Sequence, residues 1–112
     1  MDKIQQFLSD FQGLSKTNGV KFWERPENYS IMNLLELNRA EVTQRLLNLT
    51  KYDYLEGPLS QAGFSDAWGF GQTIKGNEVY IKLTIVEKKK RRMAVCISFH
   101  EPTKPLKYPY QR

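Results

Sequence analysis

Two segments near the C-terminal end of the chain alternate apolar and polar residues with a period of two. A period of two is typical of half-buried β-strands. The side assigned to the core carries Val79, Ile81, Leu83 and Ile85 in the first segment, and Met93, Val95, Ile97 and Phe99 in the second. If the two strands pair, the opposite side presents a phenol, an ammonium, two hydroxyls and the one imidazole of the chain, on Tyr80, Lys82, Thr84, Ser98 and His100.

The N-terminal half shows helical spacing instead. A helix over residues 2–14 is predicted by the recurrence of Ile4, Phe7, Leu8, Phe11 and Leu14. Asn28 is placed to cap a short second helix. Asn38 and Glu41 have the spacing of a capping box, and we expect the third helix that they start to end near residue 50.

The remaining segments are predicted to be an edge strand, loops and turns. Residues 20–24 are rich in β-formers and end before a proline, which favours a short edge strand. Residues 51–66 contain Gly57-Pro58 and are predicted to form a loop. Turns are expected at 75–77 and over the basic run 87–92.

This order of elements predicts an α+β fold. N-terminal helices (about 1–55) would pack on one face of a small antiparallel sheet (about 67–101), followed by a Pro-rich tail over 102–112. A chain of 112 residues suits a single domain spanning 1–112. The second face of such a sheet is open to solvent or to a ligand.

Several classes of protein are disfavoured by the composition. No segment approaches the roughly 20 apolar residues of a membrane span. The N-terminal residues are amphipathic and include acids, unlike a signal peptide. Cys96 is the one cysteine, so an internal disulfide is impossible, and its mid-strand position indicates a reducing compartment. We therefore expect a cytoplasmic protein.

Charge is distributed unevenly along the chain. Residues 1–66 hold seven Lys/Arg and nine Asp/Glu, a net charge of −2, whereas residues 67–112 hold ten and three, a net charge of +7. A one-sided basic surface is typical of a protein that binds a polyanion, either nucleic acid or an acidic protein. A solvated sheet face with a lysine-rich turn would give the same pattern.

The polar face of the two strands has the groups that RNA cleavage requires. Attack of a 2′-hydroxyl on the adjacent phosphorus needs a base, an acid and a cation near the phosphorane. His100 and Tyr80 can move protons, with Lys82 favouring the charged form of the phenol and stabilising the phosphate oxygens. The phosphates of the strand would be held by Lys88, Lys89, Lys90, Arg91 and Arg92.

The strand before these two adds a feature to the same face. Trp68 and Phe70 are predicted to face the core, which leaves Gly69 and Gly71 on the open side, where a ligand backbone could approach closely. The scattered carboxylates lack metal-ligand spacing, and no phosphate-binding glycine loop is present. We expect no metal and no cofactor. The alternative is that this is an ordinary solvated sheet face with a surface histidine and no site.

The run NEVYIKLTIVEKKKRRMAVCISFHE resembles the C-terminal half of the MqsR family of toxins from bacterial type II toxin–antitoxin systems. The resemblance extends upstream through LELNRAEVTQRLLNLTKYDYLEGP and covers about residues 20–110. WGFG, EVYIKL, AVCISFHE and PLKYPY are most similar to the branch found in Gram-positive bacteria and their phages. The resemblance implies a RelE-like fold with a curved sheet, metal-independent cleavage of mRNA, and a cognate antitoxin that neutralises the toxin.

Only some of the functional residues of that family have a residue of the same type at the matching position of this chain. Its catalytic tyrosine and the lysine two residues later match Tyr80 and Lys82, and a functional lysine of the last strand falls on His100. A further lysine falls on Glu56, which reverses the charge, and a glutamine falls on Gly69. Among nearby side chains, Gln72 is a candidate to reach the space beside that glycine and bind RNA.

Three hypotheses follow. The first is an mRNA-cleaving toxin whose catalytic residues are Tyr80, His100 and Lys82. The second is an RNA-binding module that has lost catalysis through the changes at Glu56 and Gly69. The third is an interaction protein, for example a phage regulator, whose basic face meets an acidic protein.

Overall fold

The computed structural model describes residues 2–61 and 64–110. The helices are α1 (Lys3–Asn18), α2 (Pro26–Leu34), α3 (Arg39–Leu47) and a short 3-10 turn, η1 (Lys51–Asp53). The strands are β1 (Val20–Phe22), β2 (Tyr54–Gln61), β3 (Phe64–Ile74), β4 (Asn77–Lys88) and β5 (Arg91–His100). Within the described residues, no helix is long and apolar enough to cross a membrane.

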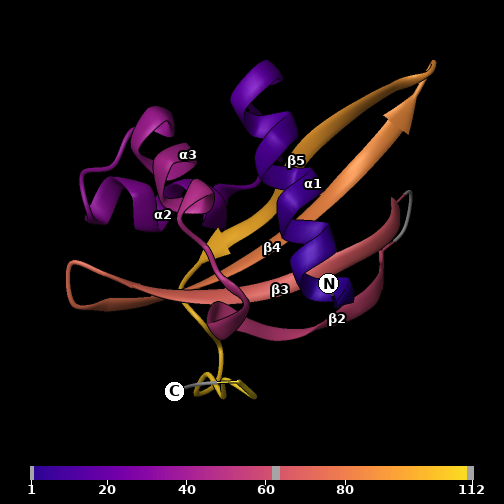
Figure 1. Ribbon diagram of the computed structural model, residues 1–112. Helices are drawn as coiled ribbons and strands as arrows, with labels where there is room; N and C mark the ends of the chain where they lie inside the picture. The colour runs from indigo at the N-terminus through magenta and orange to yellow at the C-terminus, as the bar shows by residue number, and fades with distance from the viewer. Residues whose placement is uncertain (1, 62–63, 111–112) are drawn as a thin grey trace.

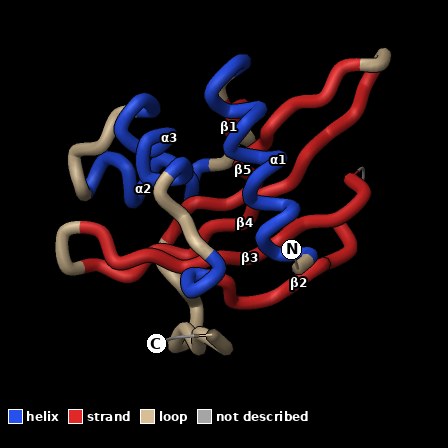
Figure 2. Tube along the Cα trace, viewed as in Figure 1, coloured by secondary structure: helices blue, strands red, loops and turns tan. Residues whose placement is uncertain are grey.

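The five strands form one sheet in the order β1-β5-β4-β3-β2, and the three helices cover one of its faces (Figures 1 and 2). The predicted α+β fold is confirmed. The sheet is mixed rather than purely antiparallel, because the edge strand β1 runs parallel to β5. The connection between these two strands spans most of the chain, so local sequence patterns carry no information about their relative direction.

The core lies between the helices and the covered face of the sheet. Phe11 of α1 is fully buried, and Phe7 stacks on Trp68 with ring centroids 5.5 Å apart. The predicted inward orientation of Trp68 and Phe70 is confirmed. The capping box of α3 also forms as predicted, with the Glu41 backbone N–H donating to Asn38 Oδ1 at 2.8 Å.

The loop predicted over residues 51–66 is wrong for residues 51–61 and 64–66, and residues 62–63 of that prediction lie outside the described residues. The short turn η1 is followed by β2, which pairs antiparallel with β3. This pairing changes register three times, and the strand contains the cis peptide Gly57–Pro58. Irregular strands of this kind lose the strict alternation that identifies a strand in sequence. The sheet therefore has an additional edge strand beside β3.

The predicted core side of β5 is correct only near its C-terminal end. Lys82 pairs with Ser98 but Leu83 pairs with Cys96, so Ile97 is an extra residue in a β-bulge. Beyond the bulge the two sides exchange. Ala94 and Cys96 join the main core, whereas Val95 and Ile97 pack in a small cluster on the opposite face.

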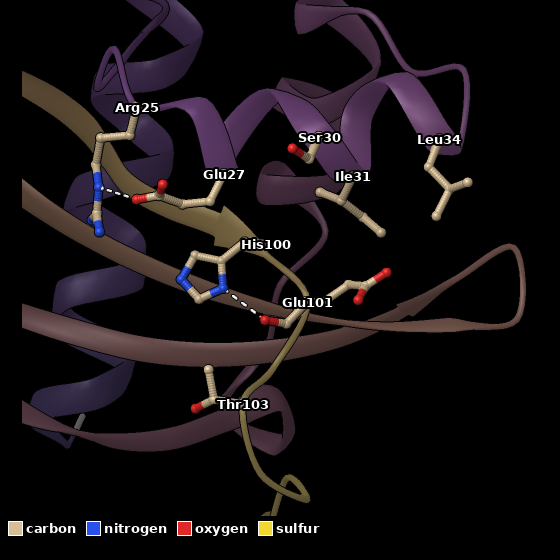
Figure 3. Close-up of a pocket in the computed structure, with 8 residues that line it drawn as sticks. All are labelled: Arg25, Glu27, Ser30, Ile31, Leu34, His100, Glu101 and Thr103. Atoms are coloured by element: carbon tan, nitrogen blue, oxygen red, sulfur yellow. Dashed lines mark hydrogen bonds and ion pairs between the residues drawn. The ribbon is translucent and has the colours of Figure 1, made fainter.

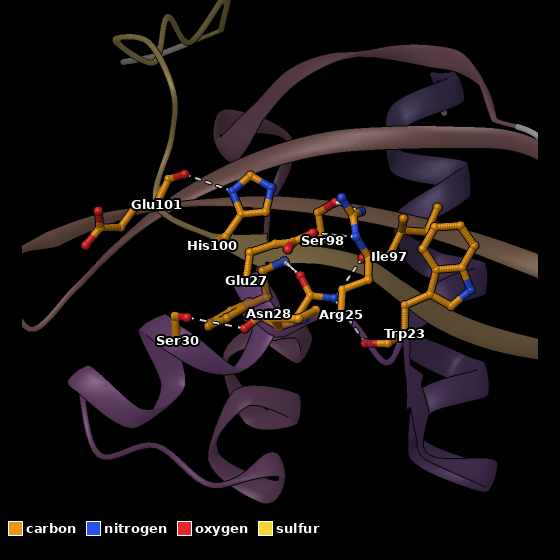
Figure 4. A network of polar contacts seen from close by, with 11 residues as sticks. Trp23, Arg25, Glu27, Asn28, Ser30, Ile97, Ser98, His100 and Glu101 are labelled. Atoms are coloured by element: carbon orange, nitrogen blue, oxygen red, sulfur yellow. Dashed lines mark hydrogen bonds and ion pairs between the residues drawn. The ribbon is translucent and has the colours of Figure 1, made fainter.

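Asn28 is not the N-cap of α2, which begins at Pro26 after Arg25. Its side chain is 1% exposed and completes the edge of β5 where β1 ends (Figure 4). The amide donates to the Ile97 carbonyl at 2.9 Å and accepts from the Phe99 backbone N–H at 3.0 Å. Asn28 thus pairs with β5 in place of a strand residue, which fixes α2 beside the last residues of that strand.

The turn expected over the basic run 87–92 is confined to the centre of that run. β4 continues to Lys88 and β5 starts at Arg91, so only two residues turn the chain. Lys89 and Lys90 both have positive φ, 52° and 63°. Two successive left-handed residues are typical of a type I′ hairpin turn. The basic side chains therefore lie at the tip of a long β-hairpin.

Cys96 gives a prediction for alkaline pH. Burial raises the pKa of its thiol to about 12 from an ordinary 9.0, so the folded state holds this proton more tightly than the unfolded chain. The resulting stabilisation is complete below about pH 9 and is lost as the pH rises towards 12. We expect the free energy of unfolding to fall by about 1.4 kcal/mol per pH unit from this group. Urea unfolding between pH 8.5 and 10 should show a flatter dependence for Cys96→Ala; equal slopes would contradict the assignment.

Candidate functional site

A cleft of about 700 Å³ lies on the face of the sheet opposite the helices. Its floor comes from β4 and β5, one side from β2, and the other wall from the tail that follows β5. The three predicted catalytic residues, Tyr80, Lys82 and His100, all line it. Charged groups from other parts of the chain also reach the cleft, on Arg25, Glu56, Lys104 and Lys107.

The strand register brings the predicted catalytic residues together. Tyr80 pairs with His100, and Lys82 pairs with Ser98. The rings of Tyr80 and His100 are 5.6 Å apart between centroids, at an interplanar angle of 32°. Directly opposed side chains on one sheet face are close neighbours. A phenol, an imidazole and an ammonium thus occupy adjacent positions on the floor of the cleft.

Glu56 of β2 joins this group, and sequence reasoning missed it as a partner. The Tyr80 hydroxyl donates to Glu56 Oε2 at 2.6 Å. Burial, together with the hydrogen bond to Glu56 and its negative charge, raises the pKa of the Tyr80 phenol above its ordinary value. The expectation that Lys82 favours a charged phenol is therefore wrong. Tyr80 is held neutral, with its proton directed at a carboxylate.

Gly69 of β3 makes the contact between Glu56 and Tyr80 possible. A Cβ at this position would lie 2.8 Å from Glu56 Cγ and 2.9 Å from the Tyr80 hydroxyl oxygen. Real Cβ atoms do not approach other heavy atoms so closely. The space expected to admit a ligand backbone is instead filled by the protein's own carboxylate and phenol.

The second glycine of this face, Gly71, lies under the C-terminal tail. A Cβ there would be 2.5 Å from the Tyr108 hydroxyl oxygen and 2.8 Å from Leu106 Cδ1. Further along the tail, the Tyr110 ring packs at 5.8 Å from that of Tyr54, between centroids. The contacts of Leu106 and Tyr108 with Gly71 hold the tail on the open face, where it forms a wall of the cleft.

The protonation of His100 is fixed at one of its two nitrogens. Its Nδ1 lies 2.8 Å from the backbone carbonyl oxygen of Glu101. A carbonyl oxygen can only accept, so Nδ1 carries a proton and donates it to this bond. The ring is half-buried, and Nε2 is the nitrogen left to exchange a proton with a substrate.

Arg25 adds a cation to the cleft from the segment before α2. Its Nη1 donates to the Ser98 hydroxyl at 3.3 Å, and its Nε lies 2.7 Å from Glu27 Oε1 (Figure 4). Arg25 and Lys82 therefore flank Ser98 from two elements far apart in sequence. Two cations beside a phenol and an imidazole suit a phosphate group between them.

Two sets of predicted RNA-binding residues lie elsewhere. The basic side chains Lys88, Lys89, Lys90, Arg91 and Arg92 are at the tip of the β4–β5 hairpin, at the far end from the tail (Figure 1). Lys88 lies eight positions after Tyr80 in β4, roughly 26 Å along the strand. The tip can contact only a distant part of a nucleic acid that is bound in the cleft.

Gln72 does not reach the space beside Gly69, so that expectation is wrong. It pairs with the core residue Val79 and faces the helices, where its Nε2 donates to the Arg45 carbonyl at 3.3 Å. Its Oε1 is buried without a hydrogen-bond partner in the described structure. Gly69 and Gln72 are three residues apart, and an odd separation places residues on opposite faces of a regular strand.

The hairpin tip can be tested by changing Lys89→Asn and Lys90→Gly together. Asn-Gly is preferred in type I′ turns, so the turn is retained while two positive charges are removed. If the tip contacts RNA, the salt dependence of binding, log Kd against log salt, becomes shallower by about 1.4 for two lost phosphate contacts. The turnover number should not change, because the cleft is distant. The control is Lys3→Gln with Lys16→Gln on α1, and an unchanged slope would exclude the tip from the interface.

No protein-family model, curated protein or solved structure matches this chain. Across residues 2–61 and 64–110, no group of three or more His, Cys, Asp or Glu side chains is arranged to hold a metal ion. The geometry of the cleft is thus the basis for a functional proposal.

Proposed function

We propose that this protein is a cytoplasmic, metal-independent endoribonuclease that cleaves mRNA in the cleft, and that it acts as the toxin of a toxin–antitoxin pair. The observation that carries the proposal is the row of Glu56, Tyr80 and His100, joined by a 2.6 Å hydrogen bond and a 5.6 Å ring contact. Beside this row, Lys82 and Arg25 provide positive charge.

The row can account for every proton that moves when a 2′-hydroxyl attacks the adjacent phosphorus. The hydroxyl proton passes to the Tyr80 oxygen as the phenol proton passes to Glu56, so the phenol stays neutral throughout. The 2′-oxygen forms its bond to phosphorus, and the bond from phosphorus to the 5′-oxygen breaks. His100, protonated on both nitrogens, gives the Nε2 proton to the leaving oxygen. The products are a 2′,3′-cyclic phosphate and a 5′-hydroxyl.

The remaining charged groups of the cleft stabilise the negative charge of the phosphate. Negative charge develops on the non-bridging phosphate oxygens as the phosphorane forms. Lys82 and Arg25 stabilise that charge where water is partly excluded, and this is the setting in which such stabilisation is strongest. Lys104 and Lys107 on the tail wall provide further contacts to neighbouring phosphates.

The test combines growth with analysis of RNA ends. Induced expression of the wild type should arrest growth, and the purified protein should cut RNA in the presence of EDTA to give cyclic phosphate ends. His100→Ala should abolish both effects. The antitoxin would be sought as the product of the neighbouring gene that restores growth. Wild-type protein that neither arrests growth nor cuts RNA would refute the proposal.

The alternative is a binding module without catalysis, and one observation favours it. Glu56 places a negative charge in the cleft, at a position where the resemblance implies a lysine, and a carboxylate repels phosphate. Binding of RNA with steep salt dependence and no cleavage would support this alternative. Displacement of bound RNA by an acidic protein, with no preference for nucleic acid, would instead support an interaction protein.

A further inference from the structure

A second pocket, of about 530 Å³, adjoins the cleft on the side of α2 (Figure 3). The two spaces share Arg25, His100 and Thr103, so His100 stands at the boundary between them. The volume lies within the roughly 300–1,000 Å³ of small-molecule sites. A strand of RNA whose phosphate lies beside His100 would place an adjacent nucleotide in this second pocket, here named the α2 pocket.

One wall of the α2 pocket is apolar. Leu34 is 64% exposed, the largest exposed fraction among the large hydrophobic side chains of the described residues. It stands beside Ile31, which is almost fully buried. Figure 3 shows both side chains directed from α2 towards the space above Glu101. An exposed leucine beside a concave surface provides a flat apolar contact for a planar ring.

The opposite side of the pocket has one unpartnered carboxylate. Glu27 is engaged with Arg25, and the Ser30 hydroxyl donates to the Pro26 carbonyl at 3.3 Å. The Glu101 side chain has no hydrogen bond or ion pair within the described part of the chain, and only its backbone oxygen is used, by His100. The Glu101 carboxylate therefore has no hydrogen-bond donor within the described residues. It faces the apolar wall of the pocket.

We propose that the α2 pocket binds the nucleobase next to the cleaved phosphate, and selects bases that carry an exocyclic amino group. This inference rests on the proposed function. Leu34 packs against the face of the base, and the Glu101 carboxylate accepts from the amino N–H. Cytosine, adenine and guanine present such donors. Uracil presents its O4 carbonyl oxygen at the position where cytosine has the amino group, and a carboxylate repels that oxygen.

The selectivity can be measured with oligodeoxynucleotides that contain a single ribonucleotide, so that only one bond can be cleaved. Cytosine and uracil, which differ in one amino group, are compared at the position on either side of that bond. We expect kcat/KM to be roughly 5- to 150-fold higher for cytosine on one side, the range of a specific hydrogen-bonded base contact. Glu101→Gln should remove most of this preference, because an amide can donate to uracil as well as accept from cytosine.

Two further variants separate the pocket from general effects. Leu34→Ser should raise KM for both bases with little change in kcat, because it removes contact area without altering the proton-transfer groups. Glu87→Gln removes an exposed carboxylate elsewhere and should leave the preference intact. Equal rates for cytosine and uracil on both sides, or a preference that Glu101→Gln does not change, would overturn the inference and leave the endoribonuclease proposal standing.

A binding measurement keeps the two proposals distinguishable if no oligonucleotide is cut. The methyl resonances of Leu34 are followed by NMR during titration with cytidine and uridine monophosphates. Shifts at Leu34 that saturate at a lower concentration of the cytidine nucleotide would support the pocket while the proposed catalysis fails. No shift at Leu34 with either nucleotide at millimolar concentration would overturn the inference.

Discussion

Replacing Glu56 by Gln, or Tyr80 by Phe, is expected to lower the rate of RNA cleavage by about 10²- to 10⁴-fold, the usual contribution of one proton-transfer group. Each change breaks the same path, because the Tyr80 hydroxyl donates to Glu56 at 2.6 Å. The double variant should lose no more than the worse single variant, since residues that act as a unit are not additive. Single-turnover cleavage of a defined RNA measures all three rates.

The chain offers a matched control for this pair. Tyr29 donates to Glu24 Oε2 at 3.0 Å, which is a second tyrosine–glutamate contact outside the cleft. Tyr29→Phe should leave the cleavage rate within a factor of two of the wild type. If Glu56→Gln kept full activity while Tyr80→Phe did not, the proton would leave Tyr80 by another route, and the proposed relay would be wrong.

A second large loss of cleavage activity is expected from Gly69→Ala, although residue 69 is not proposed to contact the substrate. The added Cβ would lie 2.8 Å from Glu56 Cγ and 2.9 Å from the Tyr80 hydroxyl oxygen, so the two side chains must separate. Displacement of catalytic groups by about 1 Å can cost roughly 10²-fold in rate. We therefore expect kcat to fall by about this factor, with a smaller change in KM. Steady-state kinetics on a single-site oligonucleotide provide both values.

Gly13→Ala is the matched control for this substitution. No heavy atom outside the helix's own backbone and its chain neighbours lies within 4 Å of a Cβ at Gly13, and this residue is in the interior of α1. Alanine should raise the free energy of unfolding by about 0.5–1 kcal/mol there and leave cleavage unchanged. Full activity in Gly69→Ala would show that contact between Glu56 and Tyr80 is not required.

The two departures from the resembled family have a common structural explanation. Position 56 carries a glutamate and position 69 a glycine, where the resemblance implies a lysine and a glutamine. Glu56 and Gly69 are register partners in β2 and β3. The missing side chain at 69 leaves the room in which Glu56 meets Tyr80. Glu56 and Gly69 therefore fit each other, and we propose that they form one proton path together with Tyr80.

The sequence by itself determined the features that depend on neighbouring residues. The alternation in residues 79–85 identified the core face of β4, and the spacing of Asn38 and Glu41 identified the start of α3. The juxtaposition of Tyr80 with His100 followed from pairing two adjacent strands. These features could be predicted because side-chain period and capping are set by residues a few positions apart.

Only the tertiary structure decided which distant groups complete the site. Glu56 belongs to a strand whose register shifts hide its alternation, and Arg25 reaches Ser98 from 73 residues away. The extra residue at Ile97 exchanges the two faces of β5. The apolar pattern of this strand gives no sign of the exchange. Bulges, edge pairing and the filling of space above a glycine depend on the whole sheet. The local pattern placed the phenol and the imidazole together, and the packing of remote segments supplied their carboxylate and their cation.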